Sequence, residues 1–422
     1  MFTLQNTSRS TKLTLFIIMA FVFIISLGIV LYYGDHFLLG TYEKLNNDDV
    51  KYVNSARLLI NEHVLAYNSG HKPSTFIMPG VPLIVSGLML IFGQHDGGVI
   101  AYRIVNVILQ TGSIYLLFCL GRYVFNSRVA LIACVLSALY LPDYFSSGVV
   151  LSESWFKPIF MLLICFTLVA LDKKQLRYYF IVALLLTFAC YFKPQTILFS
   201  VVIAFIWLLR KYTWRQMITY TLVIAVTFCI LMSPWWIRNY VTFGHWVTFT
   251  ESAGNPLLQG AFINGNPPSA GFYEKYPQYT SKTLFQGGDK NQVITAKRIM
   301  LYGLYYEPVA YLKWYLIEKP KSLYKWPYYW KDIFGVTKAA MDKIQYYLAI
   351  VGALGIVLSL IKRQGKTLLV LLSFTYFTLV YFPFVTFSRY GYPNVFILIL
   401  FIAYLLYFVY QLLPGRKVTA DV

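Results

Sequence analysis

Two carboxylates stand side by side at the start of an amphipathic segment. Asp48 and Asp49 follow two asparagines, and apolar residues then recur at helical spacing as far as residue 60. This order predicts an interfacial helix that begins at the aspartates, with Asn46 or Asn47 as its cap. One interpretation is that both aspartates are only first-turn acids, which the helix dipole favours. The functional interpretation is a carboxylate held at the bilayer surface, beside whatever molecule binds there.

A third acid, Glu153, lies in a Leu-Ser-Glu sequence at the outer start of an apolar run, ten residues after Asp143. An ionisable residue near membrane depth is a candidate for function. Glu153 is also four residues before Lys157, so an ordinary ion pair within one helix is the structural alternative. The sequence leaves both interpretations open.

Four cations lie at or near the outer ends of apolar runs. They are Lys193 before a proline, Arg238 in Pro-Trp-Trp-Ile-Arg-Asn, Arg389 in Ser-Arg-Tyr, and Arg103 just inside a run. A long basic side chain that reaches for the interface explains any one of them. Together they indicate a pocket for an anionic headgroup, because Arg and Lys bind phosphate through charge-assisted hydrogen bonds.

Several common chemistries have no motif in the chain. GxGxxG, GxxxxGK[ST], GxSxG and HExxH are all absent from the sequence, and the five histidines lack ligand spacing. The five cysteines lie in apolar segments without a CxxC pair, so we interpret them as small core residues. We therefore expect neither nucleotide-driven chemistry nor a metal site built from His or Cys.

The composition indicates a membrane protein. Of 422 residues, 58% are hydrophobic and only 13% are charged, with 36 Lys+Arg against 17 Asp+Glu and a formal net charge of +19. A soluble chain would carry about 25% charged residues. The composition excludes a water-soluble globule and a nucleic-acid binder with a free basic face. In a membrane, the basic excess reports orientation.

We predict about ten transmembrane helices. With run 77–93 left uncrossed, the short connectors place 15 basic residues on one side, and the positive-inside rule makes that side cytoplasmic, with both termini. A bacterial plasma membrane is favoured, because the Asn6 sequon falls on the inner side. The predicted spans are 13–33, 99–121, 129–147, 154–171, 178–192, 195–209, 216–236, 344–361, 367–384 and 393–413.

The expected fold class is therefore an all-α polytopic membrane protein. We expect three parts: a catalytic N-terminal transmembrane module over 1–236, an exterior domain over 237–343, and C-terminal transmembrane helices over 344–422. The first part includes an outer loop, 34–98, with juxtamembrane helices. The second is aromatic and turn-rich, and its residues 262–343 match no pattern that we can place.

These motifs, in this order, resemble the GT-C class of integral-membrane glycosyltransferases. The branch in question contains protein O-mannosyltransferases and lipid A aminoarabinose transferases. The matching elements are D-[DE]-x-x-Y at 48–52, a Pro/Gly-rich element ending in F-G at 78–93, A-x-R at 101–103, G-R-x-x-F-x-x-R at 121–128, L-S-E at 151–153, [RK]-P at 193–194, P-W-x-x-R-N at 234–239 and R-Y-x-x-P at 389–393.

The resemblance implies a function. The donor would be a dolichyl- or undecaprenyl-phosphate-linked sugar, and the sugar would pass with inversion to a hydroxyl of a cell-envelope glycan, lipid or protein. Asp48 would be the general base, with Asp49 and Glu153 as the other catalytic candidates. Lys193, Arg238, Arg389 and Arg103 would bind the donor phosphate. A divalent metal ion stays open, because other branches of the class need one and this outer loop has no evident ligand set.

Two other functions remain as alternatives. A transporter or flippase of lipid-linked sugars predicts polar residues in the middle of several spans. In this chain the acids are concentrated in the outer loops instead. A membrane scaffold of an envelope-synthesis complex predicts that no outer acid is essential.

Overall fold

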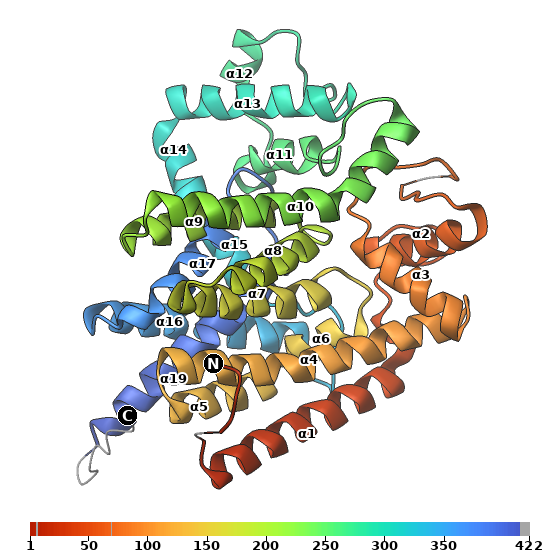
Figure 1. Ribbon diagram of the computed structural model, residues 1–422. Helices are drawn as coiled ribbons and strands as arrows, with labels where there is room; N and C mark the ends of the chain where they lie inside the picture. The colour runs from red at the N-terminus through yellow and green to blue at the C-terminus, as the bar shows by residue number, and fades with distance from the viewer. Residues whose placement is uncertain (6, 69, 414–422) are drawn as a thin grey trace.

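The structure is a computed structural model that describes residues 1–5, 7–68 and 70–413. Arg416 and Lys417, which entered the prediction of orientation, and Asn6, which entered that of a bacterial membrane, lie outside these residues. Within them every regular element is helical, and the only β-type pairing is an isolated bridge between Ile333 and Val336. Figure 1 shows the long helices running side by side as a bundle.

Six of the predicted spans coincide with helices that are long and apolar enough to cross a membrane. These are α1 (Arg9–Tyr33), α4 (Asp96–Val124), α7 (Glu153–Lys173), α10 (Trp214–Phe243), α16 (Lys338–Ile361) and α19 (Val395–Gln411), the last preceded by the short α18 (Ser388–Gly391) and a 3₁₀ turn, η6 (Tyr392–Asn394). An all-helical, multi-pass membrane fold is thereby confirmed.

The other predicted spans are broken or short. Span 129–147 is a pair, α5 (Ser127–Ala138) and α6 (Leu141–Gly148), bent by 58°, and Pro142 in the first turn of α6 explains why one helix does not continue into the other. Three further runs form shorter apolar helices: α8 (Leu176–Cys190), η2 with α9 (Pro194–Leu209), and η5 with α17 (Gly365–Leu379). The number of crossings and their orientation stay predictions.

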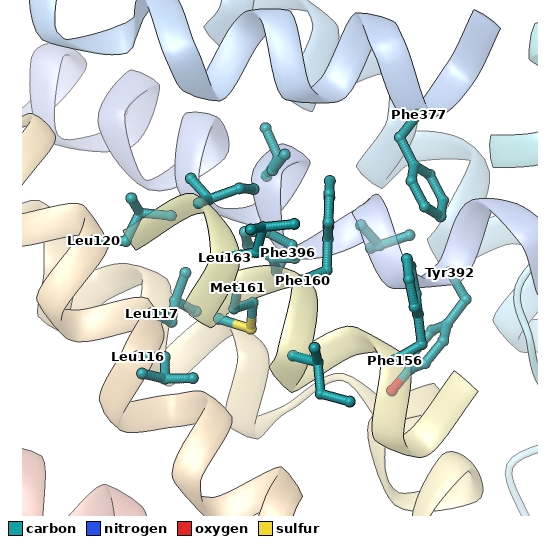
Figure 2. Packing of buried hydrophobic residues seen from close by; sticks show 14 of the residues in the cluster. Leu116, Leu117, Leu120, Phe156, Phe160, Met161, Leu163, Phe377, Tyr392 and Phe396 are labelled. Carbon is teal, nitrogen blue, oxygen red and sulfur yellow. The ribbon is translucent and has the colours of Figure 1, made fainter. Parts of the chain in front are cut away.

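The main core forms where α4, α7 and α19 meet. Figure 2 shows Leu116, Leu117 and Leu120 of α4 beside Phe160 and Met161 of α7, with Phe396 of α19 nearby. Glycines allow closer contact elsewhere. A Cβ on Gly355 of α16 would lie only 2.2 Å from the carbonyl oxygen of Phe401 on α19. Small residues at such crossings let membrane helices pack backbone against backbone.

The segments between the spans build the side of the molecule that holds the candidate site. The first includes η1 (Gly34–Phe37), which packs on α1 and α6, and the helices α2 (Asp48–Glu62) and α3 (Gly80–Phe92), which pack on each other. The predicted start of α2 is confirmed, because Asn47 is the N-cap and its side chain accepts a hydrogen bond from the Asp48 amide.

The second segment follows α10. Its elements are α11 (Gly254–Gly260), η3 (Ile263–Gly265), α12 (Ala270–Lys275), α13 (Gly288–Tyr306), α14 (Pro308–Lys313), a π-helical turn η4 (Trp314–Glu318) and α15 (Lys319–Tyr324). Residues of α11 to α14 share a small apolar core that includes Leu258, Phe272 and Ile299. From Leu323 onward, buried residues of the segment belong to the main core.

Candidate active site

Four charged side chains from distant parts of the sequence form one chain of ion pairs. Arg389 Nη1 lies 2.6 Å from Asp48 Oδ2, and Arg389 Nε lies 2.8 Å from Glu153 Oε1. Lys193 Nζ donates to the same Glu153 oxygen at 2.8 Å. The order is acid, base, acid, base, so every charge has an opposite neighbour.

The backbone explains why these side chains converge. Glu153 begins α7, and Arg389 lies on α18, where the chain enters the last long helix. Lys193 lies between α8 and η2, at a break that Pro194 enforces. The start of α3 closes on this break, because the Gly80 amide donates to the Tyr191 carbonyl at 3.0 Å and a Cβ at Gly80 would lie 2.5 Å from that oxygen.

Asp48 is the member of the network that reaches open space. Its side chain is 40% exposed, whereas those of Glu153 and Lys193 are 0% and 6% exposed. Tyr67 donates to Asp48 Oδ1 at 2.5 Å. Burial raises the pKa of the Asp48 carboxyl, but the Arg389 charge and the hydrogen bonds from Tyr67 and Arg389 outweigh it and hold the pKa below its usual value. Asp48 is therefore ionised at neutral pH.

A cavity of about 560 Å³ opens beside this network. Three of the predicted site residues, Asp48, Lys193 and Arg389, line it, and Asp48 is the only carboxylate among its described lining residues. Most of the remaining wall is apolar or aromatic, and includes Ile77, Tyr191, Phe192, Ile197, Leu198, Phe249, Tyr381 and Phe384. An apolar pocket with a few convergent charges has the character of a ligand site.

Asp49 and Arg103 lie away from the cavity. Asp49 is 1% exposed, and its Oδ2 accepts from the Leu39 amide at 2.6 Å, so it joins the preceding loop to α2. Arg103 is 2% exposed, donates from Nε to the Gly148 carbonyl at 2.8 Å, and pairs with Asp35 at 3.1 Å. Neither residue therefore lines the cavity beside Asp48.

Arg238 is also absent from the cavity wall. Its guanidinium donates to the carbonyls of Ser74 at 3.1 Å and Leu65 at 3.3 Å, near the two ends of the loop that carries Tyr67. This geometry is that of a positioning residue, one that holds Tyr67 against Asp48.

We expect Arg238→Ala to lower kcat and thermal stability while leaving the donor KM close to wild type, because the lost contacts are to a loop. Arg238→Lys keeps the charge but loses the two-pronged geometry, so it should recover little. Steady-state kinetics against donor concentration check this. A donor KM raised tenfold in Arg238→Ala, with kcat unchanged, would return Arg238 to the donor site.

The alternative prediction, an ion pair between Glu153 and Lys157 within one helix, is wrong. Glu153 turns toward Lys193 and Arg389, whereas Lys157 pairs with Asp143, both of them buried. Asp143 also accepts hydrogen bonds from Ser137 and Tyr392. Asp143 and Glu153, ten residues apart, thus belong to two separate buried groups of ion pairs.

Sequence patterns missed several residues of the site. Tyr67 lies in an irregular loop without any periodic or motif signal. Tyr390 stacks on Tyr381, with ring centres 4.9 Å apart, and the Lys193 ammonium lies 5.3 Å from the Tyr390 ring centre. The R-Y-x-x-P motif includes Tyr390, but only Arg389 was assigned a role from the sequence. Gln195, which follows Lys193-Pro194, donates to the Tyr381 hydroxyl at 2.6 Å.

Among the residues that the structure describes, no group of three or more His, Cys, Asp or Glu side chains is arranged to hold a metal ion. The acids of the candidate site are each paired with a cation or a backbone amide.

Known proteins resemble the chain in sequence and in fold. Residues 71–237 match the model of the family described as dolichyl-phosphate-mannose-protein mannosyltransferase. This segment contains Arg103, Glu153 and Lys193 but ends before Arg238 and begins after Asp48. A search of curated proteins gave no significant match.

Solved structures give matches over most of the chain. The apo oligosaccharyltransferase of Archaeoglobus fulgidus has a TM-score of 0.56 at 14% identity, over 97% of this chain and 51% of that one. The AglB oligosaccharyltransferase of the same organism, in complex with an inhibitory peptide and a dolichol-phosphate, has a TM-score of 0.50 at 15% identity. That match covers 94% of this chain and 52% of that one. ArnT from Cupriavidus metallidurans bound to undecaprenyl phosphate has a TM-score of 0.44 at 13% identity, over 94% of this chain and 78% of that one.

The fold is thus that of the GT-C class of integral-membrane glycosyltransferases, as the sequence motifs indicated. Within that class, the sequence is similar to the dolichyl-phosphate-mannose-protein mannosyltransferase family over 71–237, which is less than half of the chain. The chain spans about half the length of the oligosaccharyltransferases that it matches.

Proposed function

We propose that this protein is a glycosyltransferase that moves a sugar from a polyprenyl-phosphate-linked donor to an acceptor hydroxyl on the outer face of the membrane. The observation that carries the proposal is the shared cavity, on which one ionised carboxylate, Asp48, faces two cations, Lys193 and Arg389. Such a site suits a reaction in which a hydroxyl loses a proton and a phosphate departs as an anion.

In the proposed step, the acceptor oxygen attacks the anomeric carbon while Asp48 takes the hydroxyl proton. The bond between the anomeric carbon and the phosphate oxygen breaks, and its electron pair stays on the phosphate. Lys193 and Arg389 stabilise this growing charge from fixed positions. A single displacement inverts the anomeric carbon. Asp48 is the only carboxylate on the described cavity wall, so no second one is placed there as a nucleophile.

The apolar wall fits the lipid part of such a donor. Side chains of η2 and of the 380–384 segment line the cavity, and one of them, Leu198, is also 51% exposed. One protein of the same fold has been solved with a dolichol-phosphate. A polyprenyl chain could therefore lie along the bilayer while its phosphate reaches Lys193 and Arg389.

The decisive experiment compares envelope glycans by mass spectrometry in cells with the gene, without it, and with Asp48→Asn. The proposal requires one sugar residue to disappear in the second and third strains. Reconstitution of the full chain with a labelled polyprenyl-phosphate sugar then tests transfer directly. Movement of the donor across vesicles without any acceptor, and without loss of a glycan in cells, would favour a transporter instead.

We expect Lys193→Ala and Arg389→Ala to raise the donor KM or lower kcat by about 10–100-fold, because a hydrogen bond to a charged group contributes about 1.5–3 kcal/mol and about 1.4 kcal/mol corresponds to tenfold. Lys72→Ala is the matched control, since Lys72 is an exposed cation in the same loop region as Tyr67. Donor kinetics check the prediction. Unchanged kinetics in both cavity variants would remove the phosphate site.

The pH dependence of kcat/KM should change when the hydrogen bond from Tyr67 to Asp48 is removed. A base works only when ionised, so the rate falls as pH drops through the Asp48 pKa, which lies below its usual value. Tyr67→Phe removes a hydrogen bond to the charged form, so the pKa rises and the acid limb of kcat/KM moves to higher pH. Tyr191→Phe is the control, because Tyr191 also lines the cavity but its hydroxyl donates to the Leu231 carbonyl. An unshifted limb in Tyr67→Phe contradicts the proposed contact.

A further inference from the structure

One wall of the cavity is built by a short irregular segment between α17 and α18. We call residues 380–387 the wall segment. Val380, Tyr381 and Phe384 of this segment line the cavity, and Arg389 follows it on α18. The wall segment forms turns in place of a continuing helix, so its backbone groups need partners from other elements. Whatever supplies those partners therefore helps to set the shape of the cavity.

The first partner of the wall segment is α11. The Val385 amide donates to the Pro256 carbonyl at 2.7 Å. Gly260 lies against the same segment, because a Cβ there would be only 2.3 Å from the carbonyl carbon of Phe384. A larger side chain at position 260 would therefore displace the wall segment. Pro256 itself lines the cavity, so α11 and the wall segment both contribute to its wall.

The second partner of the wall segment is α15. Its first residue, Lys319, donates from Nζ to the carbonyls of Phe382 and Phe384, the latter at 2.8 Å. Further along α15, the hydroxyls of Ser322 and Thr386 share a hydrogen bond. One ammonium thus holds two points of the wall segment at once. It does so with charge-assisted hydrogen bonds, which are roughly twice as strong as neutral ones.

Lys319 is buried without an acidic partner. It is 0% exposed, and burial lowers the pKa of its ammonium to about 7, an effect that no acid among the described residues offsets. The ammonium instead lies 4.4 Å from the ring centre of Tyr315 and 5.7 Å from that of Trp314, contacts that favour a cation. A buried charge is costly unless it is paired and hydrogen-bonded. Because an apolar side chain would serve packing better, the role of Lys319 lies in the hydrogen bonds that it donates.

We propose that Lys319 is a positioning residue for donor binding, which holds the wall segment in the shape that receives the lipid part of the donor. This role rests on the proposed function, because it concerns the lipid-linked donor. Lys319 is not among the described residues that line the cavity, so it acts through the wall segment. Without its ammonium, the turn that carries Tyr381 and Phe384 should loosen, whereas Lys193 stays paired with Glu153 on other elements. The protein should then lose contacts with the lipid and keep most of those with the phosphate.

Hydrogen–deuterium exchange of the full chain tests whether Lys319 holds the wall segment. In Lys319→Met, a side chain of similar length fills the space but donates no hydrogen bond, so the amides of 380–387 should exchange several-fold faster than in wild type. Lys321→Met is the matched control, since Lys321 is exposed on the same helix and pairs with Glu318. Unchanged exchange in Lys319→Met overturns the proposal.

A second variant covers the case that Lys319→Met does not fold. Gly260→Ala leaves the ammonium in place but adds a Cβ that must push the wall segment aside. It should speed exchange over 380–387 and weaken binding of a lipid-linked phosphate. Wild-type exchange together with wild-type binding in this variant overturns the proposal.

Lipid binding tests the consequence for the donor. The probes are labelled undecaprenyl phosphate and, in competition with it, dimethylallyl phosphate, which has a single isoprene unit. We expect Lys319→Met to bind undecaprenyl phosphate several-fold more weakly than wild type and dimethylallyl phosphate almost as well, because Lys193 and Arg389 still face the phosphate. An equal loss for both probes, or no loss for either, overturns the proposal. If the wild-type chain does not bind undecaprenyl phosphate, the proposed function is contradicted, and the donor role of Lys319 falls with it whatever the exchange shows.

Discussion

Asp48→Asn should lower the rate of sugar transfer by about 10²–10⁴-fold, which is the usual contribution of a general base. The amide keeps the size of the side chain and can still accept hydrogen bonds, but it cannot take a proton. It also leaves Arg389 without one of its two acidic partners. Because Lys193 and Arg389 both remain on the cavity wall, the donor KM should still change much less than kcat. Turnover of a labelled donor by purified protein in vesicles measures both.

Two other acids on α2 serve as controls for Asp48. Glu62→Gln changes an acid at the far end of the helix, where Glu62 pairs with His71, and should leave turnover unchanged. Asp49→Asn should lower thermal stability, because Asp49 is buried and accepts the Leu39 amide. Burial raises the pKa of the Asp49 carboxyl, against backbone amides that lower it. If Asp48→Asn keeps near wild-type turnover, Asp48 is not the base.

The sequence predicted where the long helices of this fold lie better than it predicted where the other helices break or end. A long apolar run can only be satisfied as a helix in lipid, because every backbone group must be paired internally, so α1, α4, α7 and α10 follow from composition alone. The break between α5 and α6 did not follow in the same way. Whether Pro142 kinks a helix or ends it depends on the neighbours that receive the freed backbone groups.

For the candidate site, the sequence indicated which cations lie near the ends of apolar runs, but not the direction in which their side chains point. The end of a span fixes how deep a cation lies, and Lys193, Arg238 and Arg389 were expected at similar depth for that reason. Which way each points depends on packing between helices that are distant in sequence. Thus Arg389 reaches Asp48, 341 residues away, while Arg238 turns to the carbonyls of Leu65 and Ser74. No motif spacing contains that information.

Glu153 has a different role from Asp48, and its burial shows why. It is fully buried and lies between two cations, which would repel each other across the cavity wall if the carboxylate were absent. Its negative charge lets Lys193 and Arg389 share one small region, where in our proposal they face a single phosphate. Glu153 is therefore best regarded as a positioning residue, whose removal should affect the fold and the donor site together.

Glu153→Gln should destabilise the protein by about 3–5 kcal/mol, the usual cost of removing one partner from a buried ion pair. The glutamine leaves Lys193 without an acidic partner and Arg389 with only Asp48. Thermal unfolding in a Cys229→Ser background, which removes the exposed thiol, measures the loss when it is followed with a thiol-reactive dye on the four buried cysteines. A glutamine of equal size rules out a cavity as the cause.

The double variant Glu153→Gln, Lys193→Met separates the charge effect from general damage. It removes one buried cation along with the acid, so Arg389 and Asp48 remain as a neutral pair, and much of the lost stability should return. Donor binding should stay weak, since one phosphate ligand is gone. If the double variant is as unstable as the sum of its single changes, the two residues are not coupled. In that case the chain of ion pairs does not organise the site.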